Sequence, residues 1–263
     1  MMQALQTAAS GMLAQEMNLD NIANNLANAS TSGFRQRRLQ FEDLLYQNLV
    51  APGSASTQQT TVSSGLEVGM GTRPASTEMV STQGTLSATN NPLDLAIQGN
   101  GFFQIQMPDG TLAYTRSGAF QLDANGDMVT ADGYPLQPPI TVPLNATGVS
   151  IGTDGTVTAT VPGSSQAQQV GTITLATFAN IGGLNSDGSN LFSPTLASGD
   201  PIVGTPGGNQ GLGTIQQGEL EESNVDVVDE FVAMIEAQRS YEANSRVVQA
   251  ADQMQQQLNG LQS

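Results

Sequence analysis

Apolar and small side chains recur at alternating steps of three and four residues through the first thirty positions. This spacing places them along one face of an amphipathic helix, in a heptad stripe. Several asparagines on the other faces lower the helix propensity, so the predicted helix depends on a packing partner for its order. The positions expected to make that contact are Leu5, Ala8, Met12, Leu19, Ile22 and Leu26.

A second heptad stripe lies at the other end of the chain, where Ser223 or Asn224 could cap the helix. Two arrangements remain open for the two stripes. They could form a helical hairpin within one molecule, or they could be shared between copies of the chain. The expected contact positions are Val227, Phe231, Met234, Tyr241 and Val248, followed after a register shift by Met254 and Leu258.

Between the two stripes the pattern changes to short alternating or apolar runs that are bounded by turn residues. Five dipeptides of the Asp-Gly or Asn-Gly type favour hairpin connections. The stretches 50–64 and 198–213 have the composition of linkers. The runs expected to form strands are 101–107, 128–130, 149–151, 156–161 and 171–178.

These patterns predict an α+β fold, in which terminal helices pair as a coiled coil and a central, mostly antiparallel β domain forms a barrel or sandwich. Residues 1–30 and 222–263 are expected to form the helical part. Residues 31–72 and 212–221 are expected to connect it, through extended strands and loops that include a polar insertion at 46–65. Residues 73–211 are expected to form the β-rich part.

The charge is strongly acidic, with 23 acidic residues, seven basic residues and a formal net charge of −16. Nucleic-acid binding requires basic patches, so nucleic acid is not an expected partner. Identical copies repel each other at long range, and any self-association therefore depends on apolar contacts and short-range hydrogen bonds. The N-terminus shows neither the basic region and apolar run of a signal peptide nor a membrane span.

The chain contains no histidine, cysteine or lysine. Catalytic triads, thiolate sites, Schiff-base lysines and phosphate-binding loops are thereby excluded. Carboxylate chemistry stays open in principle, but the acidic residues lie mostly at predicted turns. The sequence 123–127 begins like a calcium loop but has Met128 and Tyr134 where an EF-hand needs glycine and glutamate, so an Asn-Gly hairpin is the better interpretation. No enzyme activity, cofactor, metal or small-molecule substrate is predicted.

Motifs in a fixed order resemble those of the axial proteins of the bacterial flagellum, the rod and hook family, and the resemblance covers essentially the whole chain. At the N-terminal end the motifs are 11–13 (GML), 21–28 (NIANNLAN), 31–35 (TSGFR) and 41–46 (FEDLLY). In the middle they are 100–103 (NGFF), 114–120 (YTRSGAF) and 132–136 (DGYPL). At the C-terminal end they are 217–221 (QGELE), 223–226 (SNVD) and 234–244 (MIEAQRSYEAN).

The resemblance implies a structural subunit that polymerises helically, with its paired helices lining a tube and its β domain outside. It implies export through the flagellar type III apparatus without a cleaved signal. The implied location is the basal body, in the rod that crosses the periplasm. The implied partners are further copies of the chain, the proximal rod proteins, the hook protein and the P-ring and L-ring proteins.

The polar insertion favours a distal rod subunit over a proximal rod or hook subunit of the same family, because the resemblance associates it with a straight, stiff rod. The residues that mark it are Tyr46, Pro52, Gly53 and Gly65. The leading expectation is therefore a rigid, hollow drive shaft that transmits torque from motor to hook. A proximal rod or hook subunit is the first alternative, and a secreted, carboxylate-dependent glycan hydrolase is a distant one.

Overall fold

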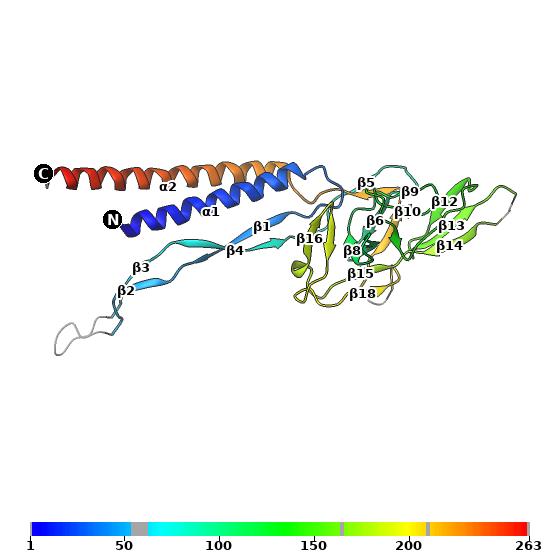
Figure 1. Cartoon of the computed structure of the whole chain (residues 1–263), viewed down its shortest axis with the longest axis horizontal. Coiled ribbons are helices and arrows are strands. Elements are labelled where there is room, and N and C mark those ends of the chain that lie inside the picture. The colour runs from blue at the N-terminus through cyan, green and yellow to red at the C-terminus, as the bar shows by residue number, and fades with distance from the viewer. Residues whose placement is uncertain (1, 54–62, 164–165, 209–210, 262–263) are drawn as a thin grey trace. The chain divides into compact units, whose positions relative to one another are not determined.

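The computed structural model of the chain describes residues 2–53, 63–163, 166–208 and 211–261 (Figure 1). The chain divides into two compact units, each assembled from segments that are distant in sequence. The helical unit contains residues 1–27, 37–78 and 226–263, and the β unit contains residues 28–36 and 79–225. Both termini belong to the helical unit, as the paired terminal stripes predict.

The helical unit is built on two helices, α1 (Met2–Ala27) and α2 (Val227–Leu261), which lie side by side and run in opposite directions (Figure 1). The N-cap of α2 is Asp226, whose carboxylate accepts hydrogen bonds from the backbone N–H groups of Val228 and Asp229 at 2.8 and 3.3 Å. The prediction of Ser223 or Asn224 as the cap is therefore wrong. Asn224 instead accepts a 2.6 Å bond from the backbone N–H of Gln36 and lies before the helix.

A long two-stranded hairpin completes the helical unit. Its outward arm consists of β1 (Arg37–Asp43) and β2 (Tyr46–Val50), and its return arm consists of β3 (Leu66–Gly69) and β4 (Thr72–Met79). Strand β1 pairs with β4, and β2 pairs antiparallel with β3. The sequence 50–64, which has a linker composition, thus begins in strand β2, and residues 54–62 lie outside the described part.

One buried amide, that of Asn25, joins α1 to both other parts of the helical unit. Its side chain is 1% exposed. Its Nδ2 donates to the carbonyl of Arg37 at 2.8 Å and to the carboxylate of Glu230 at 3.1 Å, and its Oδ1 accepts from the N–H of Arg37 at 3.0 Å. Asn21 adds a second bond to the same carbonyl at 2.7 Å. These bonds set the register of α1 against β1 and α2.

The β unit contains several small sheets, and the strand pairings described in it are antiparallel. The largest sheet has seven strands in the order β16-β17-β8-β7-β15-β18, with β11 also paired to β7. These strands are β16 (Asn185–Gly188), β17 (Leu191–Ser193), β8 (Leu112–Thr115), β7 (Phe102–Gln106), β15 (Leu175–Thr177), β18 (Ile202–Gly204) and β11 (Leu136–Gln137).

The smaller sheets surround this one, and a short 3-10 helix spans Ile181–Gly183. Within the described residues no sheet closes into a barrel, whereas the α+β class and the antiparallel centre are confirmed. The smaller sheets are β12-β13-β14, β19-β6, β20-β5 and β10-β9. Their strands are β12 (Gly148–Ile151), β13 (Thr156–Thr160), β14 (Gln168–Thr172), β19 (Thr214–Gln217), β6 (Leu95–Gln98), β20 (Glu219–Glu221), β5 (Leu86–Ala88), β10 (Met128–Val129) and β9 (Gln121–Leu122).

Strand β7 is buried on both faces and separates two apolar clusters. Successive side chains of a strand point to opposite faces, so Phe103 joins the larger cluster while Phe102 joins the smaller one. Phe103 meets Phe120 edge to face, with ring centroids 5.2 Å apart. In the smaller cluster Tyr114 meets the Phe178 ring in the same way at 4.8 Å. Six of the twelve Phe and Tyr residues of the chain thus lie in the two clusters beside this strand.

The predicted turns are confirmed at four of the five Asp-Gly and Asn-Gly dipeptides, whose glycines at 110, 126, 133 and 155 have φ values between 81° and 90°. The fifth prediction is wrong, because Asp187-Gly188 lies in strand β16 and the turn that follows is formed by Ser189 and Asn190. The dipeptide at Gly126 closes the β9–β10 hairpin, where Asp123 accepts bonds from two backbone N–H groups at 2.8 Å. The single strand predicted for 171–178 is wrong. The chain there forms the end of β14 and then β15, which belong to different sheets.

Replacing Asn25 by alanine is expected to lower the free energy of unfolding by about 2–3 kcal/mol, because it removes the three hydrogen bonds that this buried side chain makes to the Arg37 backbone and the Glu230 carboxylate. Asn18→Ala on the same helix is the control, since the Asn18 side chain makes no hydrogen bond to another described residue, and it should cost less than about 1 kcal/mol. Urea unfolding followed by helical circular dichroism measures both. Equal losses in the two variants would contradict the assigned role of Asn25.

Candidate functional site

The seam between α1 and α2 is formed by small and polar residues rather than by large apolar ones. Ala237 and Ala251 of α2 are buried, as are Ala8 and Ala14 of α1. A Cβ added at Gly11 would come within 2.8 Å of the Asn244 amide. Small residues let helix backbones approach closely, so this seam is already complete within one chain. The α2 residues on it follow a seven-residue repeat: Glu230, Ala237, Asn244 and Ala251.

A second apolar face runs along the first turns of α2. Val228, Phe231, Val232 and Ile235 have the spacing of one helix face, and each side chain is about half exposed or more. With 3.6 residues per turn, this face lies on the side of α2 opposite to Glu230 and Ala237. The helix therefore has one face of small and polar residues against α1 and an opposite apolar face that is about half exposed or more.

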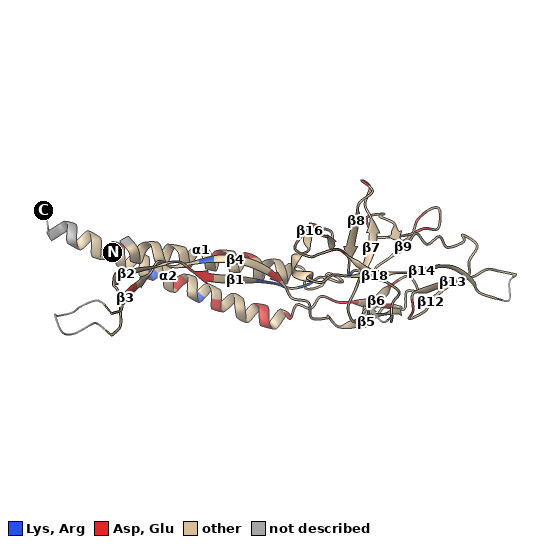
Figure 2. Ribbon diagram, turned by 90° about the horizontal axis from the view of Figure 1, so that it is seen from below, with Lys and Arg blue, Asp and Glu red and all other residues tan. Residues whose placement is uncertain are grey.

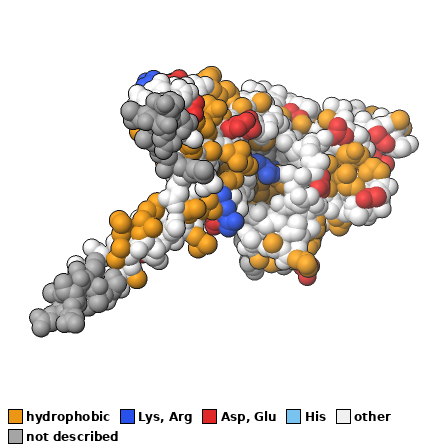
Figure 3. All heavy atoms as spheres, turned by 60° about the vertical axis from the view of Figure 1, so that its left-hand side comes forward, with side chains coloured by type: hydrophobic (Ala, Val, Ile, Leu, Met, Phe, Trp, Pro, Cys, Tyr) orange, Lys and Arg blue, Asp and Glu red, His pale blue; other side chains and the backbone are white. Residues whose placement is uncertain are grey.

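Two further exposed apolar groups lie in the helical unit. On α1 they are Leu13 and Met17, one turn apart and on the side away from the buried Ile22. On the hairpin, large apolar side chains collect along β2 and β3, where Figure 3 shows hydrophobic atoms gathered along the projecting arm. The exposed members of the hairpin group are Phe41, Leu45, Tyr46, Leu49, Val50 and Leu66. Exposed apolar patches of this kind mark interaction surfaces.

The predicted contact residues of the two stripes fall into different environments. Ala8 and Ile22 are buried, and the other four predicted residues of α1 (Leu5, Met12, Leu19 and Leu26) are half-buried. On α2, Met234 and Val248 are half-buried at the edge of the seam. Val227, Phe231, Tyr241 and Met254 are exposed, and Leu258 lies where side chains are not described. The role of these residues in assembly stays a prediction.

The residues that mark the polar insertion lie at the base of its loop. Pro52 and Gly53 form a turn after β2, and Gly53 has a φ of 78°. Gly65 lies against Pro52, because an added Cβ would approach the Pro52 ring within 2.7 Å and the Val50 carbonyl within 2.6 Å. Tyr46 is exposed at the start of β2. The effect of the insertion on stiffness stays a prediction.

The β unit contains a buried ion cluster in which Glu221 lies between two arginines. Its two carboxylate oxygens contact Arg35 Nη2 at 2.8 Å and Arg116 Nε at 2.5 Å. The side chains of Arg35, Arg116 and Glu221 are 7%, 2% and 1% exposed. Each belongs to one of the three motifs 31–35, 114–120 and 217–221. The cluster therefore joins segments that are far apart in the chain.

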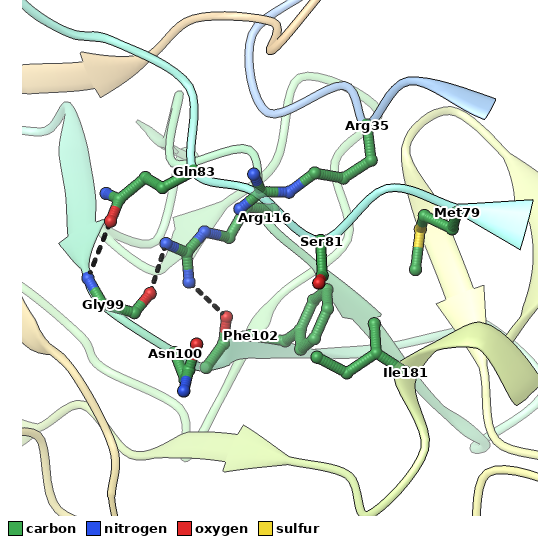
Figure 4. A pocket seen from close by; sticks show the side chains of 10 residues that line it. Arg35, Met79, Ser81, Gln83, Gly99, Asn100, Phe102, Arg116 and Ile181 are labelled. Atoms are coloured by element: carbon green, nitrogen blue, oxygen red, sulfur yellow. Dashed lines mark hydrogen bonds between the residues drawn. The ribbon is translucent and has the colours of Figure 1, made fainter. Parts of the chain in front are cut away.

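Backbone carbonyls complete the coordination of Arg116. Its Nη atoms donate to the carbonyls of Ile97, Gly99 and Gly101 at 2.6–2.8 Å, which Figure 4 shows in part. Burial lowers the pKa of both guanidinium groups, and the Glu221 carboxylate opposes that shift. Arginine keeps its charge in proteins even so. The cluster is thus a permanently charged group buried within the β unit.

The exposed charges form weaker pairs. On the hairpin, Arg38 contacts Glu78 at 3.1 Å and Arg73 contacts Glu42, with both signs of charge visible on the ribbon in Figure 2. Hydrogen bonds from Arg38 and Gln40 lower the pKa of the exposed Glu78 carboxyl. Pairs this exposed contribute little to stability because water screens them.

The described residues contain no group of three or more side chains that could hold a metal ion. No helix in the described part is long and apolar enough to cross a membrane. The features missed by the sequence analysis are the ion cluster, the polar seam around Asn25 and Glu230, and the second face of α2. The repeat of Val228, Val232 and Ile235 beside Phe231 could have indicated that face.

Replacing Glu221 by glutamine should destabilise the β unit by about 3–5 kcal/mol, because two buried guanidinium groups lose their counter-charge. The neighbouring Glu222→Gln is the matched control. Its side chain is exposed, so the change should stay within about 0.5 kcal/mol. Chemical denaturation followed by tyrosine fluorescence compares the two, and a Glu221→Gln variant as stable as the control would overturn the role assigned to the cluster.

Comparison with known proteins finds three families that match consecutive parts of the chain. The family described as "Flagella basal body rod protein" matches residues 5–35. The "Flagellar hook protein FlgE/F/G D1 domain" matches residues 96–159, and the "Flagellar basal body rod FlgEFG protein C-terminal" family matches residues 216–261. The first and last matches cover the two helices, and the middle match covers much of the β unit.

Similar proteins cover the whole chain. A protein of Caulobacter vibrioides named "Flagellar basal-body rod protein FlgG" is 48% identical over 263 residues, covering 100% of both chains. The protein of the same name from Buchnera aphidicola of Acyrthosiphon pisum is 48% identical over 99% of this chain and 100% of its own. The Bacillus subtilis protein of that name is 38% identical over 99% of both. The resemblance to the flagellar rod and hook proteins is confirmed, and the chain belongs to the FlgG family of flagellar basal-body rod proteins.

Proposed function

We propose that this protein is a structural subunit of the flagellar distal rod and that copies of it assemble helically into a rigid, hollow shaft that transmits torque from motor to hook. The observation that carries the proposal is the second apolar face of α2, formed by Val228, Phe231, Val232 and Ile235. Full-length similarity to relatives named as FlgG rod proteins supports it. In this role the protein does no chemistry and needs no cofactor.

The position of this face favours an open polymer. Since the seam with α1 is complete within one chain, the second face of α2 is free to meet a different surface on another copy. A contact between two different surfaces is heterologous, and it builds a helical filament when its rotation does not close into a ring. The exposed pair Leu13 and Met17 and the apolar side chains of the hairpin are further surfaces available for such contacts.

The free energy of burying this apolar face and the net charge of the subunit are compatible with reversible, salt-dependent assembly. Fully burying one large apolar side chain contributes about 1.5–3 kcal/mol, so several half-exposed ones together contribute a few kcal/mol per contact. Against this stands the mutual repulsion of subunits with a net charge of −16. The face itself carries no charge, and salt screens the charges elsewhere.

Within the shaft, residues 1–30 and 222–263 form the inner helical wall in this proposal. Residues 73–211 form the outer domain, and residues 31–72 with 212–221 connect the two. The exposed hairpin arm contacts neighbouring subunits, and the insertion 46–65 thereby stiffens the rod. The predicted assembly residues of both helices act at these contacts.

The proposed location is the rod of the basal body, where it crosses the periplasm. The subunit reaches that place through the flagellar type III export apparatus, without a cleaved signal. Its proposed neighbours are the proximal rod proteins on one side and the hook protein on the other, with the P-ring and L-ring proteins around it. A proximal rod or hook position is the alternative, and full-length similarity to relatives named FlgG favours the distal rod.

Replacing Phe231 and Ile235 together by serine tests the assembly face. These side chains are 49% and 50% exposed, so the monomer should keep its stability within about 1 kcal/mol. Losing about 2 kcal/mol of contact energy should raise the critical concentration for tube formation by more than about tenfold. Sedimentation and negative-stain electron microscopy at high salt measure this change.

Leu196→Ser is the control for that experiment, because Leu196 is a fully exposed apolar residue of the β unit. Its critical concentration should equal that of the unchanged chain. Normal tube formation by the Phe231 and Ile235 variant would show that the face is not used. A chain that stays monomeric at every concentration, even with rod fragments as seeds, would count against the proposed function as a whole.

Replacing residues 51–65 by an Asn-Gly turn tests the insertion, since this dipeptide closes a two-residue hairpin between the paired residues Val50 of β2 and Leu66 of β3. Tubes should still form, because the helices are untouched, but they should bend more easily. The persistence length measured from electron micrographs should fall several-fold. If the tubes were as straight as those of the unchanged chain, the insertion would not be the element that stiffens the rod.

A further inference from the structure

A cavity of about 90 Å³ lies beside the ion cluster of the β unit, and the only charged side chains that line it are two arginines, Arg35 and Arg116. Glu221, which pairs with both, is not part of the cavity wall. Figure 4 shows both arginine side chains at one side of the pocket, with Met79, Phe102 and Ile181 forming an apolar side. In a chain with a net charge of −16, this is a cationic cavity.

The buried arginines have donors to spare. A guanidinium group carries five N–H groups. The Nη1 atom of Arg35 donates to the Thr82 carbonyl and its Nη2 atom pairs with Glu221. Within the described residues these two contacts use two of the five N–H groups of Arg35. Three N–H groups therefore remain on a side chain that is 7% exposed. Arg116 uses four, and one remains.

The charges of the cluster also do not balance. Two guanidinium groups and one carboxylate sum to +1, and all three side chains are almost fully buried. A buried charge without a counter-charge is costly. Carbonyl oxygens offset part of this cost at Arg116. A bound anion would offset the rest of the cost of this buried positive charge. It would also accept hydrogen bonds from the N–H groups of Arg35 that have no other acceptor among the described residues.

We propose that this cavity binds one small oxyanion from solution, of the size of phosphate or acetate. Arginine is suited to such groups because its planar donors match two oxygens at once. A volume of about 90 Å³ suits one small anion. The rim residues Ser81 and Asn100 are exposed, so the site is open to solvent. The glycines at 99 and 101, with φ values of 105° and 140°, let the backbone bend around the arginine heads.

The test is a titration of the full-length, monomeric protein with sodium phosphate at constant ionic strength, followed by the Nε–H resonances of its arginines in NMR spectra. The Arg35 and Arg116 resonances should shift as phosphate is added, and the size of the shift should reach a plateau. The titration curve should give a dissociation constant on the order of 1 mM. The exposed Arg73 and Arg246 serve as internal controls and should not saturate. Small shifts that are alike at all four arginines and never saturate would overturn the proposal.

Two variants provide a second readout. Phosphate should raise the melting temperature of the unchanged chain and of Arg73→Gln in a saturable manner, and the rise should be lost in Arg35→Gln. An equal rise in all three proteins would mean that phosphate acts without this site. If Arg35→Gln does not fold, the NMR titration of the unchanged chain decides. Tube formation is measured separately, so this site and the assembly face can fail independently.

Discussion

Glu221 is the residue on which the organisation of the β unit depends. One carboxylate holds two arginines that lie 105 and 186 positions earlier in the chain, and it does so with almost no access to water. Around it, the backbone of Gly33 donates to the Glu221 carbonyl at 2.8 Å, and Gln36 donates to the side chain of Asn224. The segments through which the chain begins and completes this unit are therefore held side by side. Burying three charges costs free energy, but the resulting ion cluster fixes how these segments meet.

The helical unit is held together by a close contact between two helices and not by a buried ion cluster. Its seam uses alanine, glycine, two asparagines and Glu230, so several large apolar side chains of α2 are left for other contacts. An ordinary helical hairpin would bury those side chains internally. Here the first turns of α2 expose Val228, Phe231, Val232 and Ile235 on the side away from α1. A helix with two opposed faces can belong to its own hairpin and to a larger assembly at the same time.

Sequence reasoning recovered the periodic features and missed those that depend on tertiary contact. The heptad stripes predicted both helices, and four of the five Asp-Gly and Asn-Gly pairs predicted turns correctly, because both signals are local. The N-cap was assigned wrongly because three residues of the segment 223–226 have capping side chains, and only the structure distinguishes Asp226 from Ser223 and Asn224. The division of 171–178 into two strands depends on tertiary pairing, because β14 pairs with β13 whereas β15 pairs with β7 and β18. The ion cluster could not be predicted by spacing, since its members come from three distant motifs, although those motifs were recognised one by one.

The pairing of the first helix with the last has a consequence for the order of folding. Helix α1 finds its partner only when α2 is present, about 200 residues later in the chain, and Glu221 likewise reaches its arginines late. Contacts between distant segments form slowly because a long loop must close first. A chain that passes through a narrow channel with its N-terminus first cannot complete the helical unit while residues 226–263 are still inside. In the export route proposed above, this topology delays folding of the helical unit until the last segment has emerged.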